Sequence, residues 1–251
     1  MRDLSTYFWL LKLGAFLNVY LLLDLPESAD PRVLIPAQIF LGVSAFRCLF
    51  PVWYGGNIVF HDSPLSSIFL TRSLATFSEV AYIFQFSEVL RRLAPEGESL
   101  IAGLSWLMVA AVVISQGFVW SAIASGRTSL YFWEEFGWFL LFAANTLASL
   151  LLWFGNDDAR LLLGLNLVFG ALYLPWQTLH LRSILTRASG EDPASAHHAW
   201  TEGLRRALVE RNRSVDGSDW GGSIGLMWMT AYWATLIPAW VYTVASRIPP
   251  P

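Results

Sequence analysis

The segment HDSPLSSIFLTRSLATFSE, residues 61–79, combines a helix start with ionisable side chains at the beginning of what the sequence indicates is a membrane span. Serine at an N-cap accepts a hydrogen bond from a free backbone N–H, and proline is favoured at the first helical position, so Ser63 and Pro64 predict where the helix begins. If this helix spans a membrane, Arg72 and Glu79 lie at membrane depth. An ionisable side chain is costly there and is a functional candidate by default.

Two further features of this helix concern its ion pairs. Two turns, about 10 Å along the axis, separate Arg72 from Glu79. We therefore expect each of them to find its partner on another helix. Near the far end of the same helix, Glu88 lies at local spacing from Arg91 and Arg92 and is expected to pair with them.

The composition of the whole chain is typical of an integral membrane protein. Of its 251 residues, 55% are hydrophobic and 14% are charged, whereas soluble domains carry about 25% charged residues. Its mean hydropathy is +0.48. The apolar runs are continuous and of spanning length, so the expected fold is all-α. The net charge of −3 gives no reason to expect a nucleic-acid partner.

We predict a polytopic bundle of seven transmembrane helices that forms a single transmembrane domain over residues 1–251. Each span is near the ~20 residues that a bilayer core requires. The predicted spans are about 7–23, 33–52, 64–90, 100–124, 131–154, 161–185 and 220–245. The connection 187–219 is expected to be cytoplasmic, with an amphipathic helix at its centre over residues 196–213.

Loop arginines indicate how the chain is oriented, because cytoplasmic loops carry an excess of basic residues. On the side of the N-terminus lie Arg2, Arg127, Arg187, Arg205, Arg206, Arg211 and Arg213. On the opposite side lie Arg32, Arg91, Arg92, Arg160 and Arg247. The bias places the N-terminus in the cytoplasm, in a multi-pass protein of the plasma or inner membrane.

Polar residues in five of the predicted spans fall at similar depth. With alternating span directions, the late part of each even span and the early part of each odd span share one half of the membrane. The polar groups in this half are Arg47, His61, Asp62, Arg72, Gln116, Glu134, Glu135, Gln177, His180 and Arg182, with Glu79 and Asn145 near the middle. We therefore predict a polar half-cavity open to the cytoplasm.

These residues supply the candidate site. A carboxylic acid in an apolar pocket can keep its proton near neutral pH and donate it, while a second carboxylate or a histidine acts as base. The candidate catalytic residues are Glu79, Glu134 and His180. The candidate substrate-binding residues are Arg47, Arg72, His61, Asp62, Glu135, Asn145, Tyr173, Gln177 and Trp138.

Several chemistries lack the residues that they require. A retinal Schiff base needs a lysine in the bundle, normally in the last span, and Lys12 is the only lysine. The single Cys48 excludes an internal disulfide. No zinc-protease, P-loop or magnesium-diphosphate motif is present. We predict no metal and no cofactor.

The leading functional hypothesis is an integral membrane enzyme that acts by acid/base chemistry on a lipophilic small molecule. Cyclases and isomerases of terpenoid, sterol or carotenoid type perform such chemistry, and aromatic faces could stabilise a developing cation. One alternative is a proton- or ion-coupled carrier or channel that uses the same half-cavity. Another is an accessory subunit with a membrane-protein partner, in which the polar stripes serve helix association.

Overall fold

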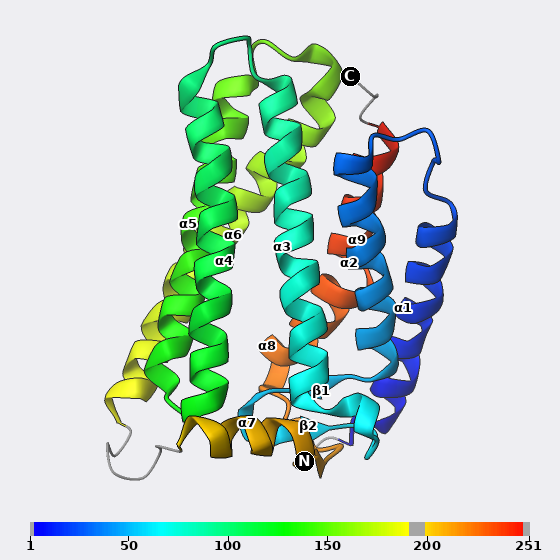
Figure 1. The fold of residues 1–251 in the computed structure, drawn as a ribbon, viewed down its shortest axis with the longest axis vertical. Helices are drawn as coiled ribbons and strands as arrows, with labels where there is room; N and C mark the ends of the chain where they lie inside the picture. Colours follow the sequence, from blue (N-terminus) through cyan, green and yellow to red (C-terminus); the bar gives the residue numbers. More distant parts are fainter. Residues whose placement is uncertain (1–2, 191–198, 248–251) are drawn as a thin grey trace. The chain divides into compact units, whose positions relative to one another are not determined.

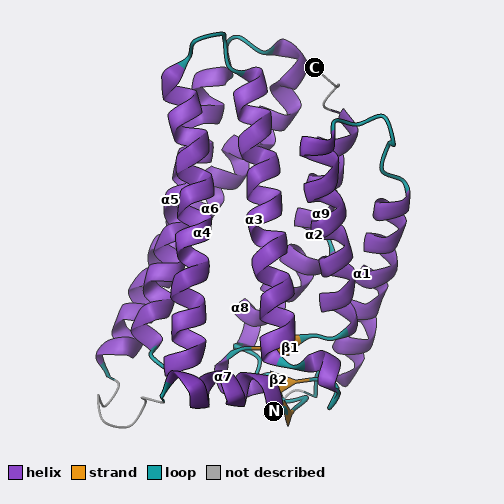
Figure 2. Cartoon of the chain, in the orientation of Figure 1, coloured by secondary structure: helices purple, strands orange, loops and turns teal. Residues whose placement is uncertain are grey.

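The computed structural model describes residues 3–190 and 199–247, and nearly all of its regular elements are helices (Figures 1 and 2). The α-helices are α1 (Ser5–Leu23), α2 (Pro31–Leu49), α3 (Ile68–Leu93), α4 (Ser99–Ser125), α5 (Thr128–Leu152), α6 (Arg160–Ser189), α7 (Trp200–Val209), α8 (Gly222–Met227) and α9 (Leu236–Arg247). Short 3-10 turns are η1 (Gly55–Asn57), η2 (Pro64–Ser66) and η3 (Asp157–Ala159), and η4 (Trp228–Ala234) is a π-helix. The strands are β1 (Val52–Trp53), β2 (Ile58–Val59) and β3 (Asn212–Arg213).

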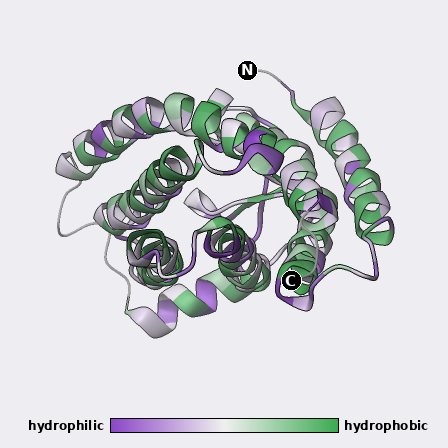
Figure 3. Cartoon of the chain, turned by 90° about the horizontal axis from the view of Figure 1, so that it is seen from above, coloured by the Kyte–Doolittle hydropathy of each residue, from purple (hydrophilic) through white to green (hydrophobic). Residues whose placement is uncertain are grey.

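All seven predicted spans are helical, which confirms the all-α class. In the described part of the chain, six helical segments are long and apolar enough to cross a membrane. The third predicted span, α3, is not in that set, although its 26 residues give it a length of about 39 Å. The helices are apolar over much of their surface (Figure 3), and Phe16, Leu23 and Leu172 are strongly exposed, as lipid-facing side chains would be.

Two boundaries differ from the sequence-based expectation. The Ser63 side chain accepts a hydrogen bond from Leu65 N at 3.3 Å, so the predicted cap is confirmed. However, it caps only the turn η2, because extended backbone at Ser67 delays α3 to Ile68. The predicted amphipathic helix over 196–213 is shorter than expected, with α7 ending at Val209 and β3 following. Residues 191–198 of that connection lie outside the described residues.

The contacts divide the chain into two compact units. Unit 1 is Met1–Tyr82 with Leu204–Pro251, and unit 2 is Ile83–Gly203, so the boundary falls inside α3. In unit 1, α1 packs on α2, and both contact η4 and α9. A small sheet closes one end of this unit: β1 pairs antiparallel with β2, and β2 pairs parallel with β3.

Unit 2 is built from α4, α5 and α6, which pack in sequence order. Small residues allow close approach: a Cβ added to Gly137 would lie 1.8 Å from Ser115 Oγ, and one added to Gly170 would lie 2.0 Å from Thr146 Oγ1. Glycine at helix interfaces is typical of membrane bundles, where packing replaces the hydrophobic driving force.

The π-helix η4 is held in place by α1 and α2. Asn18 Nδ2 donates to Trp233 O at 3.0 Å, and the Cys48 thiol donates to the same carbonyl at 3.5 Å. A Cβ on Gly14 would lie 2.5 Å from Ala234 Cβ, so only glycine permits this approach. A π-helical turn offsets the side chains that follow from ordinary α-helical positions, and such turns are frequent at functional sites.

We predict that Gly14→Ala destabilises the protein by about 1–3 kcal/mol, because the new methyl group overpacks the α1–η4 contact. Thermal unfolding in detergent, followed by circular dichroism, measures the change. The matched control is Gly42→Ala on α2, where an added Cβ meets no atom within 4 Å. That control should leave stability unchanged or raise it by up to about 1 kcal/mol. Equal unfolding temperatures for both variants would contradict this packing.

Candidate functional site

Arg72 and Glu79 form a buried ion pair within α3. Arg72 Nη2 donates to Glu79 Oε2 at 2.6 Å, and the two side chains are 3% and 7% exposed. The expectation that they are too far apart to pair was therefore wrong. Both residues lie on one helical face, and the long arginine side chain covers the two turns between them.

The guanidinium of Arg47, near the end of α2, is also buried, with 6% of the residue exposed. Its Cζ lies 5.3 Å from the centre of the Tyr54 ring and 5.0 Å from that of Trp233. Among the described residues, its Nε and Nη1 have no hydrogen-bond partner. Aromatic faces attract a cation, but they leave its N–H groups without acceptors.

Tyr54 connects the two arginines. Arg72 Cζ lies 5.4 Å from the same ring that Arg47 contacts. We call Arg47, Tyr54, Arg72, Glu79 and Trp233 the arginine cluster; it holds two guanidinium groups and one carboxylate. Its formal charge is therefore +1, and its three charged side chains are buried in unit 1.

Aromatic side chains extend the cluster along the interior of unit 1. Phe40 stacks on Trp233 with ring centres 5.8 Å apart, and its ring centre lies 4.9 Å from that of Tyr82. Tyr232 lies 6.0 Å from Tyr82 and 4.7 Å from Trp233, again between ring centres. All four of these side chains are buried. They give the charged cluster an apolar surround.

A second polar group lies within unit 2, between α5 and α6. Gln177 Nε2 donates to Glu135 Oε2 at 2.7 Å, and His180 Nε2 lies 3.8 Å from Glu135 Oε1. The imidazole stacks on Trp176, with centres 5.2 Å apart and planes within 9°. Among the described residues, His180 Nδ1 is buried without a hydrogen-bond partner. A carboxylate beside an imidazole is an arrangement suited to proton transfer.

The other predicted residues of unit 2 mainly join its helices. Asn166 Nδ2 donates to Ser149 Oγ at 2.9 Å and to Asn145 Oδ1 at 3.4 Å, which ties α6 to α5. Tyr173 packs on Phe142 with ring centres 4.7 Å apart.

Two further candidates in unit 2 are buried on α5: Trp138, whose ring centre is 6.1 Å from that of Phe142, and Glu134.

The predicted residues therefore fall into separate groups. Unit 1 brings Arg47 and Arg72 together with Glu79, and it places His61 and Asp62 at another cavity. The group in unit 2 is built on Glu135. Convergence of all candidate residues on one half-cavity stays a prediction.

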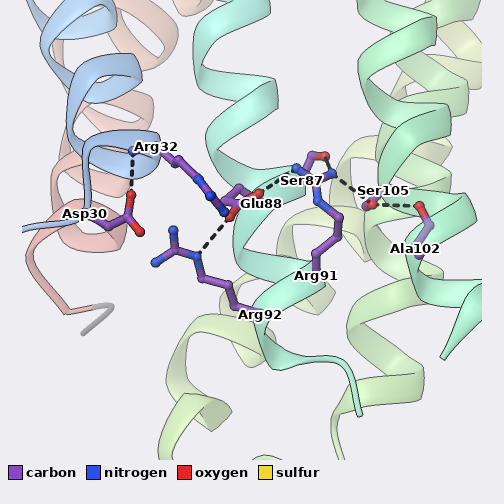
Figure 4. Close-up of polar contacts among 8 residues, drawn as sticks. All are labelled: Asp30, Arg32, Ser87, Glu88, Arg91, Arg92, Ala102 and Ser105. Carbon is purple, nitrogen blue, oxygen red and sulfur yellow. Dashed lines mark hydrogen bonds and ion pairs between the residues drawn. The ribbon is translucent and has the colours of Figure 1, made fainter. Parts of the chain in front are cut away.

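The local pairing predicted at the end of α3 is confirmed. Glu88 accepts hydrogen bonds from Arg91 Nη2 at 2.8 Å and from Arg92 Nε at 3.1 Å (Figure 4). Arg91 also donates to Ser87 and, at 3.1 Å, to Ser105 Oγ on α4. These contacts secure the helix end and do not resemble a catalytic arrangement.

Sequence reasoning missed the aromatic residues of the arginine cluster. Tyr54 lies in a loop and has no helical periodicity to mark it. Trp233 lies in the predicted last span, where the π-helical turn changes which residues share a face.

Comparisons gave no match to any family model, any curated protein or any solved structure. Function must therefore be inferred from the geometry of the site. Within residues 3–190 and 199–247, no group of three or more His, Cys, Asp or Glu side chains is placed to hold a metal ion.

We predict that Glu79→Gln destabilises the protein by about 3–5 kcal/mol, because it leaves the Arg72 charge buried without its carboxylate. Replacing both residues in Arg72→Met/Glu79→Met should recover most of this loss, since the charge is removed with its partner. A double-mutant cycle with the single variants Arg72→Met and Glu79→Met, followed by unfolding in detergent, measures the coupling. A coupling energy near zero would contradict the buried pair.

Proposed function

We propose that this chain is an integral membrane protein whose arginine cluster holds the anionic group of a lipophilic small molecule, and that it acts on this molecule by acid/base chemistry. The observation behind the proposal is Arg47, a buried guanidinium that has aromatic faces on two sides and two N–H-bearing nitrogens without acceptors among the described residues. Burial of a charge is costly unless it is paired and hydrogen-bonded. An anionic ligand would supply both.

The shape of the guanidinium favours a carboxylate or a phosphate. Its planar fork donates two parallel hydrogen bonds to such a group, which adds specificity to charge. Arg72 cannot neutralise Arg47, because both are cations, and Glu79 already accepts a hydrogen bond from Arg72. The excess positive charge of the cluster therefore favours an anion.

The remainder of the ligand should be apolar and unsaturated. Phe40 and Tyr232 pack on Trp233 of the cluster and on Tyr82, and aromatic faces pack against hydrocarbon and stabilise a developing carbocation. A prenyl, sterol or polyene chain fits this chemistry. Cyclisation or isomerisation of such a chain is the reaction class that we propose.

The geometry revises the role of Glu79. Its Oε2 accepts a hydrogen bond from Arg72, so that oxygen cannot donate a proton. We therefore assign Glu79 to proton acceptance or charge stabilisation. Glu135 and His180 form a separate carboxylate–imidazole pair within unit 2.

The binding test uses two anionic probes, oleate and farnesyl diphosphate, with oleyl alcohol and farnesol as their neutral counterparts. Quenching of tryptophan fluorescence, to which Trp233 contributes, reports binding. The wild type should prefer the anionic probes, and Arg47→Gln should bind them about 10- to 100-fold more weakly, as expected for loss of hydrogen bonds to a charged group. The control is Arg160→Gln, an exposed arginine in unit 2. Equal affinity of Arg47→Gln and wild type would contradict the proposed site.

Turnover separates an enzyme from a binding protein. Incubation with the prenyl probe should give an isomer of unchanged mass with the wild type and none with Arg47→Gln, which lacks the proposed anchor of the anionic group. Chromatography with mass detection distinguishes the isomers. Absence of product from every probe would contradict the enzymatic part of the proposal and leave the binding part standing.

A carrier is the second candidate, and one observation favours it. The last span is interrupted at Thr235, where φ is −137° and ψ is −75°, between η4 and α9. Broken helices near substrate sites are characteristic of secondary transporters. Flux of the anionic probe into proteoliposomes, lost in Arg47→Gln and retained in Arg160→Gln, would support this candidate over the enzyme.

A further inference from the structure

A cavity in unit 1 shares no lining residue with the arginine cluster. It has a volume of about 520 Å³, and its lining includes Lys12, Phe60, His61, Asp62 and Arg213. These residues come from α1, from the loop between β2 and η2, and from β3. The cavity therefore lies where α1, the loop before η2 and the strand β3 meet.

The charge of this cavity is positive. Asp62 Oδ1 accepts a hydrogen bond from Arg211 Nε at 2.9 Å, so its carboxylate is already neutralised. Lys12 and Arg213 have no ion pair among the described residues. Two cations therefore face the same cavity without a counter-charge from this part of the chain.

The small sheet fixes one of these cations. In the parallel pairing of β2 with β3, Arg213 lies opposite Val59, two residues before His61. Ser214 N donates to Val59 O at 3.1 Å and extends this pairing. Arg213 is therefore held against the loop that carries His61.

The other cation, Lys12, lies beside an exposed aromatic ring of α1. Side chains on a helix tilt toward its N-terminus, so Lys12 reaches back along α1, and its Nζ lies 3.9 Å from the centre of the Trp9 ring. Trp9 is 60% exposed, close to the start of α1. Tryptophan and lysine in such positions are typical of the headgroup level, where the phosphates of lipids lie.

His61 reports the same positive environment. Burial, together with the charges of Lys12 and Arg213, lowers the pKa of its imidazole. The ring is therefore neutral at physiological pH and can donate one hydrogen bond to an anion without adding charge. The rings of Phe60 and Phe50 beside it, at 4.5 and 6.2 Å between ring centres, offer an apolar edge to an acyl chain.

We propose that this cavity binds the phosphate group of an anionic phospholipid, with Lys12 and Arg213 as its charged ligands and His61 as a further hydrogen-bond donor. Exposed aromatic and apolar side chains of α1, such as Trp9, lie beside Lys12. The acyl chains of a lipid can pack against them, whereas a free phosphate ion cannot. The inference does not depend on the arginine cluster, and its test uses different residues.

The experiment uses the full chain in an uncharged detergent with dioleoyl phosphatidylglycerol or dioleoyl phosphatidylcholine, which share acyl chains and differ in net charge. Native mass spectrometry measures the affinity of each lipid. Each cation near an anionic headgroup contributes about fivefold, so Lys12→Gln/Arg213→Gln should bind phosphatidylglycerol about 25-fold more weakly. Arg247→Gln, an exposed arginine at the end of α9, is the matched control and should bind like the wild type.

A second readout follows the imidazole of His61 by NMR, with assignment from His61→Gln. Phosphatidylglycerol should raise the pKa of His61, because a nearby anion favours the imidazolium, and phosphatidylcholine should not. Unchanged phosphatidylglycerol binding in the double variant, or equal binding of both lipids to the wild type, would overturn the proposal. Displacement of phosphatidylglycerol by millimolar inorganic phosphate, with the same shift at His61, would overturn the assignment to a lipid.

Discussion

A guanidinium that is shut away from water needs negative charge, hydrogen-bond acceptors or aromatic faces around it, and unit 1 is arranged to provide them. Arg72 has the carboxylate of Glu79 at 2.6 Å and the ring of Tyr54. Arg47 has two aromatic rings, and its Nε and Nη1 lack acceptors in the described part of the chain. Because Tyr54 contacts both arginines, the position of one constrains the position of the other.

The surrounding fold keeps this cluster in place. The carbonyl of Trp233 is held by Asn18 from α1 and by Cys48 from α2, so the π-helical turn and its aromatic side chains are fixed from two sides. Gly14 allows α1 to approach Ala234 closely enough for this contact. Replacement of Gly14 by a larger residue would therefore disturb the Trp233 ring beside Arg47. The packing of α1 and α2 is therefore linked to the position of the Trp233 ring through the π-helix η4.

Much of the fold could be predicted from the sequence, because long apolar runs and capping residues are local signals. The helical segments follow from the apolar runs. The Ser63 cap and the pairing of Glu88 follow from residue types and spacing within one helix. The Arg72–Glu79 pair was missed because axial distance was used without the length of the arginine side chain. The role of Tyr54 and the π-helix at Trp233 could not be predicted, since both depend on contacts between segments far apart in the sequence.

The ionisable residues of the candidate site could be proposed from the sequence, but the separate groups into which they fall could not. Arg47, Arg72 and Glu79 were identified from their depth, and the structure brings them together. Periodicity could show which side chains share a helical face, but it could not show that Glu135 would accept from Gln177 beside His180. The small sheet that positions Arg213 beside His61 left no signal, because each strand has only two residues.

The central claim is that Arg47 receives the anionic group of a lipophilic ligand. The most direct measurement is an experimental density map of the wild-type protein prepared with farnesyl diphosphate, compared with a map prepared with farnesol. The account predicts density for a phosphate within hydrogen-bonding distance of Arg47 Nη1, between Tyr54 and Trp233, in the first map alone. A map in which a carboxylate of the chain itself occupies that position, with the ligand elsewhere or absent, would contradict it.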